Sequence, residues 1–207
     1  MIYSLIFVAA QAWAQDAPEA VVQYCARCHG TDGIATQPGM PHLNGQQDTY
    51  LIDVSTRFQR GKLITTVTDH VPKALDADQI DLIARHYAGS KAVRPRQETD
   101  PQKVAQGETV YRNRCADCHI DNGRDADKDA PFVGAQNLDY LLNQTRLFVT
   151  GKRRFGYLQD EAFKGLSDDE LVDDAALRVQ AGLGRSQRGE MKINGGVAHG
   201  LRPFGGP

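Results

Sequence analysis

The four cysteines of this chain stand in two short motifs with identical spacing. The motifs both read Cys-x-x-Cys-His and comprise Cys25, Cys28 and His29, and then Cys115, Cys118 and His119. Two thiols three positions apart can form thioethers with the two vinyl groups at one edge of a porphyrin. The histidine that follows is then held beneath the ring, where it binds the iron. The motifs predict two covalently bound haem c groups, with the four cysteines as attachment sites and His29 and His119 as proximal iron ligands.

Other uses of paired cysteines fit less well. A zinc ribbon has its second pair about 15–20 residues after the first, whereas Cys115 lies 115 − 25 = 90 positions after Cys25. A thioredoxin-like site requires a βαβ context, and neither motif has a strand-rich neighbourhood. A disulfide framework would not place a histidine directly after both pairs.

Length and charge narrow the class of protein further. The 207 residues suffice for one large domain or two of about 100 residues, and 41% of them are apolar and 24% charged. The formal net charge of −2 argues against nucleic acid or an anionic membrane surface as a partner.

The first 14 residues predict export. Residues 1–14 are nearly all apolar and end in Ala12-Trp13-Ala14, which resembles the small-residue cleavage site of a signal peptide. This stretch is shorter than the about 20 apolar residues of a spanning helix, although an uncleaved anchor or a buried first helix are alternatives. It lacks the basic residues that usually begin a signal peptide. Haem c is attached outside the cytoplasm, so the leader and the motifs together predict a periplasmic protein with no spanning segment after cleavage.

The two motifs belong to a longer internal repeat with an offset of 90 residues. The first-half positions that recur downstream are Pro41, Gln46, Tyr50, Leu51, Phe58, Gly61 and Lys62, which fall on Pro131, Gln136, Tyr140, Leu141, Phe148, Gly151 and Lys152. Such a repeat indicates a duplicated domain. We expect domains at residues 15–90 and 101–181, a charged linker at 91–100 and a Gly-rich, disordered tail at 182–207.

Each half reads as helical, and no segment alternates with the period of a strand. Helix-start signals are Asp16 with Glu19, Asp76 with Gln79, Asp100 before Pro101, and Ser167 with Glu170. Apolar residues at helical spacing predict further helices over residues 47–60 and 137–150. The fold class is therefore all-α, with two tandem small helical bundles, each built around one covalent haem.

A further shared segment identifies a family that the chain resembles. Residues 41–46 read Pro-His-Leu-Asn-Gly-Gln and residues 131–136 read Pro-Phe-Val-Gly-Ala-Gln. With the repeat and the haem motifs, these segments resemble the two-haem class I cytochromes c, namely the cytochrome c-four type and the cytochrome subunit of flavocytochrome c sulfide dehydrogenase. The resemblance implies two class I cytochrome c domains packed face to face, with Pro41 and Pro131 accepting hydrogen bonds from the proximal histidines.

The family pattern breaks at the distal iron ligands. In that family a methionine before each last helix binds the iron, but here the methionines are Met1, Met40 and Met191. His70 lies close to the expected position in the first half, where a solvated loop histidine is the alternative. The second loop has neither methionine nor histidine, which leaves Tyr157, Lys152 or Lys164, or Met191 or His199 from the tail. His42 is expected at the surface.

The resemblance implies a periplasmic electron carrier without catalysis of its own. Its redox partner would be a flavoprotein dehydrogenase, of which the chain could form the cytochrome subunit, or a terminal oxidase. A basic cluster is expected to steer an acidic partner and comprises Arg57, Arg60, Lys62, Lys152, Arg153 and Arg154. The alternative is a haem enzyme or gas-binding sensor with an open axial site at the second haem.

Overall fold

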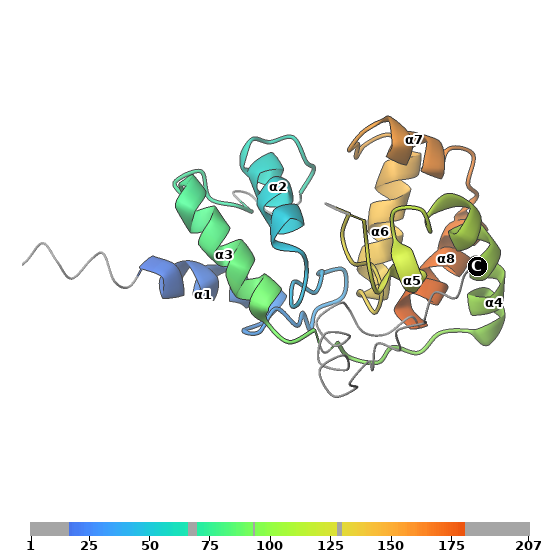
Figure 1. The fold of residues 1–207 in the computed structure, drawn as a ribbon, viewed down its shortest axis with the longest axis horizontal. Coiled ribbons are helices and arrows are strands. Elements are labelled where there is room, and N and C mark those ends of the chain that lie inside the picture. Colours follow the sequence, from blue (N-terminus) through green and yellow to red (C-terminus); the bar gives the residue numbers. More distant parts are fainter. Residues whose placement is uncertain (1–16, 66–69, 93, 128–129, 181–207) are drawn as a thin grey trace, which may run out of the picture.

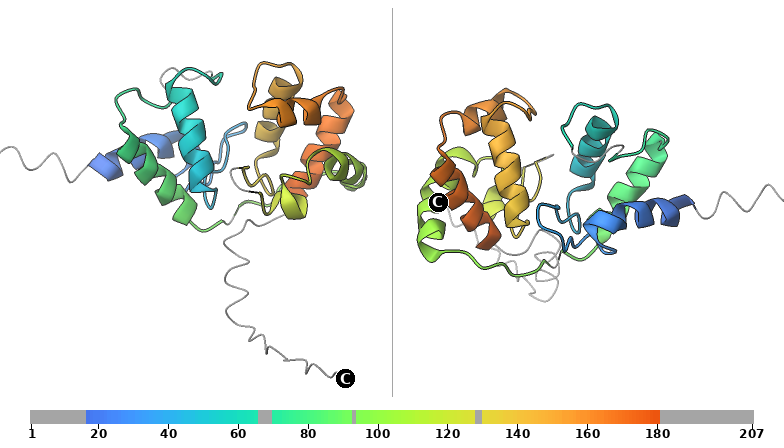
Figure 2. Two further views of the ribbon diagram at one scale, coloured as in Figure 1. Left: turned by 45° about the horizontal axis from the view of Figure 1, so that its top comes forward. Right: turned by 180° about the vertical axis from the view of Figure 1, so that it is seen from behind.

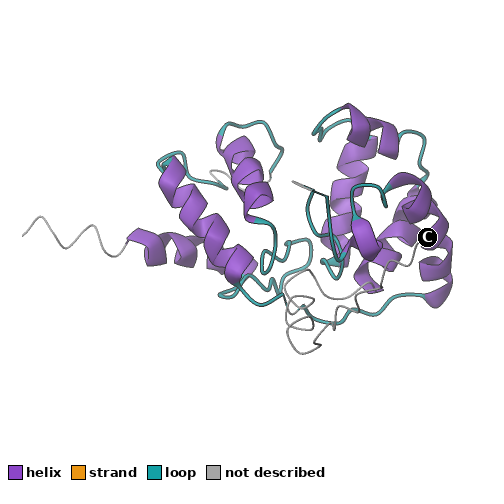
Figure 3. Cartoon of the chain, in the orientation of Figure 1, coloured by secondary structure: helices purple, strands orange, loops and turns teal. Residues whose placement is uncertain are grey.

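The computed structural model describes residues 17–65, 70–92, 94–127 and 130–180. Within these ranges the chain is helical and contains no strand (Figure 3). The helices are α1 Ala17–His29, α2 Asp48–Gln59, α3 Ala77–Gly89, α4 Pro101–Arg114, α5 Ile120–Gly123, α6 Leu138–Val149, α7 Tyr157–Phe163 and α8 Asp168–Gln180. The leader at residues 1–14, the tail at 182–207 and Met191 lie outside the described residues.

The first half is a bundle of α1, α2 and α3, with α3 packed against the other two (Figure 1). Asp76 starts α3 with the expected capping box, because its side chain accepts from the Gln79 N–H and Gln79 reaches back to Asp76. The buried side chains at the centre are Leu51, Ala84 and Tyr87, and Cys25 and Ile83 pack against them. The apolar face of α3 is therefore directed at the first Cys-x-x-Cys-His motif.

The second half repeats this bundle with α4, α6 and α8, in which α8 packs against α4 and α6. Asp100 caps α4 by accepting from the Gln102 N–H, with Pro101 in the first turn. The helices α4 and α8 cross so closely at Gly107 that an added Cβ would lie 2.1 Å from the Asp173 carbonyl oxygen. Only glycine fits at this crossing.

The repeat continues to the end of α8, beyond the point where the two sequences stop resembling each other. The Gly45 N–H donates to the Tyr87 carbonyl at 2.8 Å, and the Ala135 N–H donates to the Arg178 carbonyl at 2.9 Å. Gly45 and Ala135 are repeat equivalents, so Arg178 occupies the place of Tyr87, one residue later than the offset of 90. The last helices of the two halves, α3 and α8, therefore make the same backbone contact but carry different side chains there.

Two helices were not expected. The four-residue α5 follows His119 and includes two residues with positive φ, Asp121 and Asn122. The helix α7 lies in the stretch before α8 and packs against α6 through Phe163, whose ring stacks on Phe148 at 4.9 Å. A short helix therefore replaces the open loop expected there.

The two halves lie side by side (Figure 2), and they meet through reciprocal hydrogen bonds. The Gln46 amide donates to the Phe132 carbonyl at 2.9 Å and accepts from the Phe132 N–H at 2.8 Å. The Gln136 amide makes the same pair with His42, at 2.9 and 2.7 Å. Since Gln46 matches Gln136 and His42 matches Phe132 in the repeat, the interface has an approximate twofold axis.

Arg94, in the segment between α3 and α4, lies between the two halves. Its guanidinium donates to the Asn44 carbonyl at 3.2 Å and to the Gly134 carbonyl at 2.8 Å, and its surface is 9% exposed. Asn44 and Gly134 are also repeat equivalents. The linker predicted at residues 91–100 therefore supplies a buried cation that joins the two domains.

No helix in the described ranges is both long enough and apolar enough to cross a membrane.

Candidate haem-binding sites

Each motif histidine is held by the carbonyl of the proline segment that follows it. Nδ1 of His29 lies 3.0 Å from the Pro41 carbonyl oxygen, and Nδ1 of His119 lies 2.9 Å from that of Pro131. A carbonyl accepts only, so Nδ1 carries the proton and Nε2 keeps its lone pair. Each ring is thereby fixed in the tautomer that can bind a metal through Nε2.

Burial keeps both rings neutral. Loss of solvent lowers the pKa of His29, although its hydrogen bond to Pro41 opposes the shift. Loss of solvent, with a further contribution from the positive charge of Arg178, lowers the pKa of His119 to about 3. A metal ligand must be deprotonated to bind, and both histidines meet that requirement near neutral pH.

The cysteines are available for thioether formation. None of the four forms a disulfide, and Cys115 is buried, Cys118 is exposed and the first pair is half-buried. Cys25 and Cys28 lie on the last turns of α1, directly before His29, while α4 ends next to Cys115. The donor set of each motif therefore fits a covalently attached haem.

His70 faces His29 across the first site. Their ring centroids are 5.8 Å apart and their planes are nearly perpendicular, at 89°. Two imidazole nitrogens that each bind one metal ion at about 2 Å place their ring centroids about 6 Å apart. Phe58 of α2 supports the His70 ring at a centroid distance of 4.8 Å, and burial lowers the pKa of His70.

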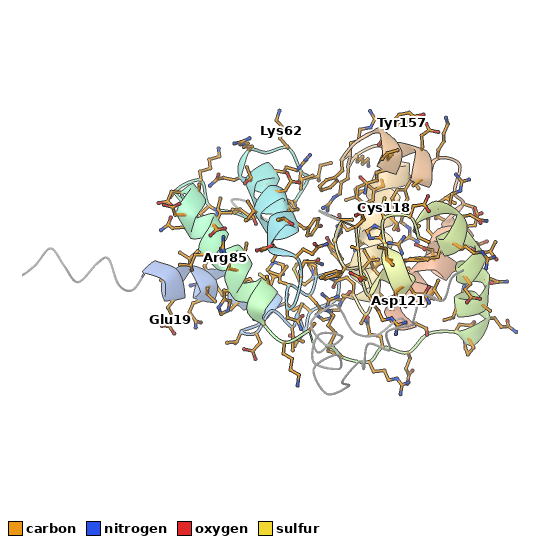
Figure 4. All side chains as sticks on the ribbon, in the orientation of Figure 1. Glu19, Lys62, Arg85, Cys118, Asp121 and Tyr157 are labelled. Carbon is orange, nitrogen blue, oxygen red and sulfur yellow. The ribbon has the colours of Figure 1, made fainter. Side chains whose placement is uncertain are left out.

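The second site has no such partner for His119 in the loop before α8. Residues 150–166 contain no methionine or histidine. Tyr157 is 74% exposed at the outer edge of α7 (Figure 4). Lys152 is also exposed, and the exposed Lys164 pairs with Glu161 at 3.3 Å. The ring of Phe148, the repeat equivalent of Phe58, packs on Phe163 and Phe155 instead of on a histidine.

A buried ion pair lies beside Cys115 and was missed by the sequence analysis. Arg178 and Asp174 are joined at 2.7 Å, and their surfaces are 3% and 2% exposed. Arg178 Nη2 also lies 3.1 Å from Cys115 Sγ. The signal in the sequence was the spacing of the two residues, one helical turn apart on the inward face of α8.

Two expected surface residues are buried. His42 is 3% exposed, because its Nδ1 accepts from the Ala35 N–H at 3.1 Å while its backbone pairs with Gln136. Arg153 is 5% exposed and lies over the rings of Phe148 and Phe155. The surface assignment of His42 was wrong, and Arg153 does not belong to an exposed basic cluster.

Two similar helical bundles, each presenting a Cys-x-x-Cys-His motif with its histidine fixed by a prolyl carbonyl, define a di-haem class I cytochrome c. Comparison with known proteins narrows this class. No protein-family model matches the chain.

The relatives and solved structures agree with one another. The chain is 32% identical over 147 residues to cytochrome c4 of Pseudomonas aeruginosa, covering 66% of this chain and 72% of the relative. It is 30% identical over 148 residues to cytochrome c4 of Azotobacter vinelandii, covering 62% of this chain and 69% of the relative. The structure of reduced cytochrome c4 from Pseudomonas stutzeri matches with a TM-score of 0.67 and 24% identity, over 81% of this chain and 97% of that one. The thiosulfate dehydrogenase TsdBA of Marichromatium purpuratum matches with a TM-score of 0.66 and 24% identity, over 75% of this chain and 36% of that one.

The chain therefore belongs to the cytochrome c4 family. The prediction of two covalently bound haem c groups in an all-α, two-domain cytochrome is confirmed. Membership supports electron transfer as the function and does not favour the alternative of a haem enzyme or gas sensor.

Proposed function

We propose that this protein is a periplasmic electron carrier whose first haem has two histidine ligands. Cys25 and Cys28 would attach the first haem, and His29 and His70 would both bind its iron. The observation that carries this proposal is the perpendicular pair of rings at 5.8 Å, with His29 already fixed through Pro41. When bound, the haem supplies the site that gains and loses one electron.

The protein's own residues set the properties of this first site. The Pro41 carbonyl accepts a hydrogen bond from Nδ1–H of His29, which fixes the ring and raises the basicity of Nε2. His70 would supply the second ligand of the iron and would thereby keep small molecules from binding there. Methionine with histidine raises the potential of a haem, so histidine in the methionine position would give this haem a lower potential than a histidine–methionine haem.

The second site follows the same plan on the proximal side. Cys115 and Cys118 would attach the second haem, with His119 as proximal ligand held by Pro131. Its distal ligand would come from the tail, where Met191 is the candidate. The exposed positions of Tyr157, Lys152 and Lys164 support this choice over the three side chains of the α7 region.

The histidine pair is tested by replacing His70→Ala in the holo-protein. We expect ferric high-spin absorption and carbon monoxide binding after reduction, both on half of the haem, because the first iron loses its distal ligand. H86A is the matched control, since His86 is an exposed histidine of the same half, and its spectrum should not change. If the H70A protein stays low-spin and does not bind carbon monoxide after reduction, His70 is not an iron ligand.

Residues 1–14 would direct export, and the redox partner would be a flavoprotein dehydrogenase or a terminal oxidase. The exposed side chains Arg60, Lys62, Lys152 and Arg154 can steer such a partner if its surface is acidic. Stable co-purification with one of these enzymes from the periplasmic fraction supports the proposal.

A further inference from the structure

The last helices of the two halves differ where they face the first cysteine of each haem motif. In the first half, Ile83 and Tyr87 pack with Cys25 in an apolar cluster. In the second half, with the one-residue shift at the end of the repeat, their places are taken by Asp174 and Arg178, which lie beside Cys115. The first half therefore has apolar side chains at the positions where the second half has a buried ion pair.

Stability alone does not explain this pair. Taking two charges out of water costs several kcal/mol per ion, and replacing a buried pair by apolar residues of similar volume is often neutral or stabilising. The first half shows that the same helical frame folds with apolar residues at these positions. The charges therefore suggest a function at the second haem site.

The cation of the pair is the charge nearer to the attachment site. Arg178 Nη2 lies 3.1 Å from Cys115 Sγ, whereas Asp174 Oδ1 lies 3.8 Å from it. The guanidinium is held in place by Asp174 at 2.7 Å and by the Tyr111 ring, 5.4 Å from its centre.

We propose that Arg178, positioned by Asp174, raises the reduction potential of the second haem. Reduction of a ferric haem adds one negative charge, which a nearby buried cation stabilises. Arg178 Nη2 lies closer than Asp174 Oδ1 to Cys115 Sγ, where the second haem would be attached, so the net effect of the pair would favour the reduced state. This inference rests on the assignment of Cys115, Cys118 and His119 to the second haem.

The test is a set of three variants of the holo-protein, studied by potentiometric titration followed by electron paramagnetic resonance, which records each ferric haem separately. R178Q leaves Asp174 unpaired and should lower the potential of the second haem. D174N leaves Arg178 unpaired and should raise it. D174I/R178Y, which installs the residues of the first half, should lower it by less than R178Q does. In all three, the potential of the first haem should stay constant.

Opposite shifts in R178Q and D174N distinguish an electrostatic role from structural damage, which would move both variants in the same direction. Equal shifts, or no shift, would overturn the inference. If R178Q fails to fold, the potentials of the second haem in D174N and D174I/R178Y still test the inference. Mass spectrometry of the intact protein separates the two proposals: one haem missing from Cys115 and Cys118 overturns both, whereas two haems with unmoved potentials overturn this one alone.

Discussion

His42 shows how a single side chain departs from its ordinary chemistry in this interface. Its Nδ1 accepts a hydrogen bond from the Ala35 N–H, so the neutral ring carries its proton on Nε2. Burial, with a smaller contribution from the positive charge of Arg94, lowers the pKa of His42 to about 4. The ring therefore stays neutral in the folded protein under conditions where it is protonated in the unfolded chain.

This shift predicts a pH dependence of stability. The folded pKa lies below the usual 6.5, so below pH 6.5 the unfolded chain binds a proton that the folded protein does not bind. The stabilising contribution is thus complete above pH 6.5 and is lost as the pH falls toward 4, by about 3 kcal/mol in all. The measurement is the free energy of unfolding of the holo-protein in urea between pH 7 and 4.

The variant H42N keeps an acceptor for the Ala35 N–H but has no titrating group. Its free energy of unfolding should fall less than that of the unchanged protein over this pH range. H86N, at an exposed histidine, should retain the full slope. An equal slope in H42N and the unchanged protein would show that His42 does not bind the proton.

At the scale of helices, the sequence predicted best where capping residues and apolar spacing agree. The starts at Asp76, Asp100 and Ser167 are all present, and at Ser167 the Glu170 carboxylate accepts from the Ser167 N–H at 2.8 Å. These signals act within one turn, so they can be identified without knowledge of the tertiary structure.

The helix α7 and the end of α8 could not be predicted in the same way. A seven-residue helix is unstable on its own, so α7 depends on the packing of Phe163 against Phe148. In α8 the inward positions carry Asp174 and Arg178, which violate the expected apolar pattern. They are buried because each satisfies the other's charge, and that pairing becomes visible only when the helix is in place.

The crossing of α4 and α8 gives a prediction for glycine. G107A places a methyl group 2.1 Å from the Asp173 carbonyl oxygen, and the helices must separate to admit it. We expect a loss of about 3 kcal/mol in the free energy of unfolding. The measurement is urea unfolding of the holo-protein followed by circular dichroism.

G89A is the matched control, because Gly89 ends α3 and an added Cβ there meets nothing within 4 Å. Alanine restricts the unfolded chain, so G89A should be stabilising by about 0.5–1 kcal/mol. Equal effects of the two substitutions would mean that the helix crossing tolerates a methyl group.

At the scale of the whole molecule, residues at equivalent positions of the repeat form the contact between the two halves. Gln46 and Gln136 were identified from the sequence as matched positions, but their role emerges only when the domains pack, since each binds the backbone of the other half. Arg94 was read as part of a charged linker. It lies between the equivalent carbonyls of Asn44 and Gly134, a position that only the assembled pair of domains defines.

The reciprocal glutamines predict that the interface behaves as one unit. Q46A leaves the N–H and carbonyl of Phe132 without their partner, and Q136A does the same to those of His42. Each should lower the free energy of unfolding by about 1–3 kcal/mol, the cost of buried polar groups that lose their hydrogen bonds. Q102A, at an exposed glutamine of α4, should cost nearly nothing.

The double variant decides whether the contacts are coupled. If the loss of one glutamine already separates the halves and admits water to the interface, the second substitution removes little more. The cost of Q46A/Q136A should then be smaller than the sum of the two single costs, beyond the about 0.5 kcal/mol expected for independent sites. Urea unfolding of the four proteins, followed by haem absorption, measures the difference. An additive result would mean that the two glutamine contacts break independently, and that Arg94 and the remaining contacts hold the halves together without them.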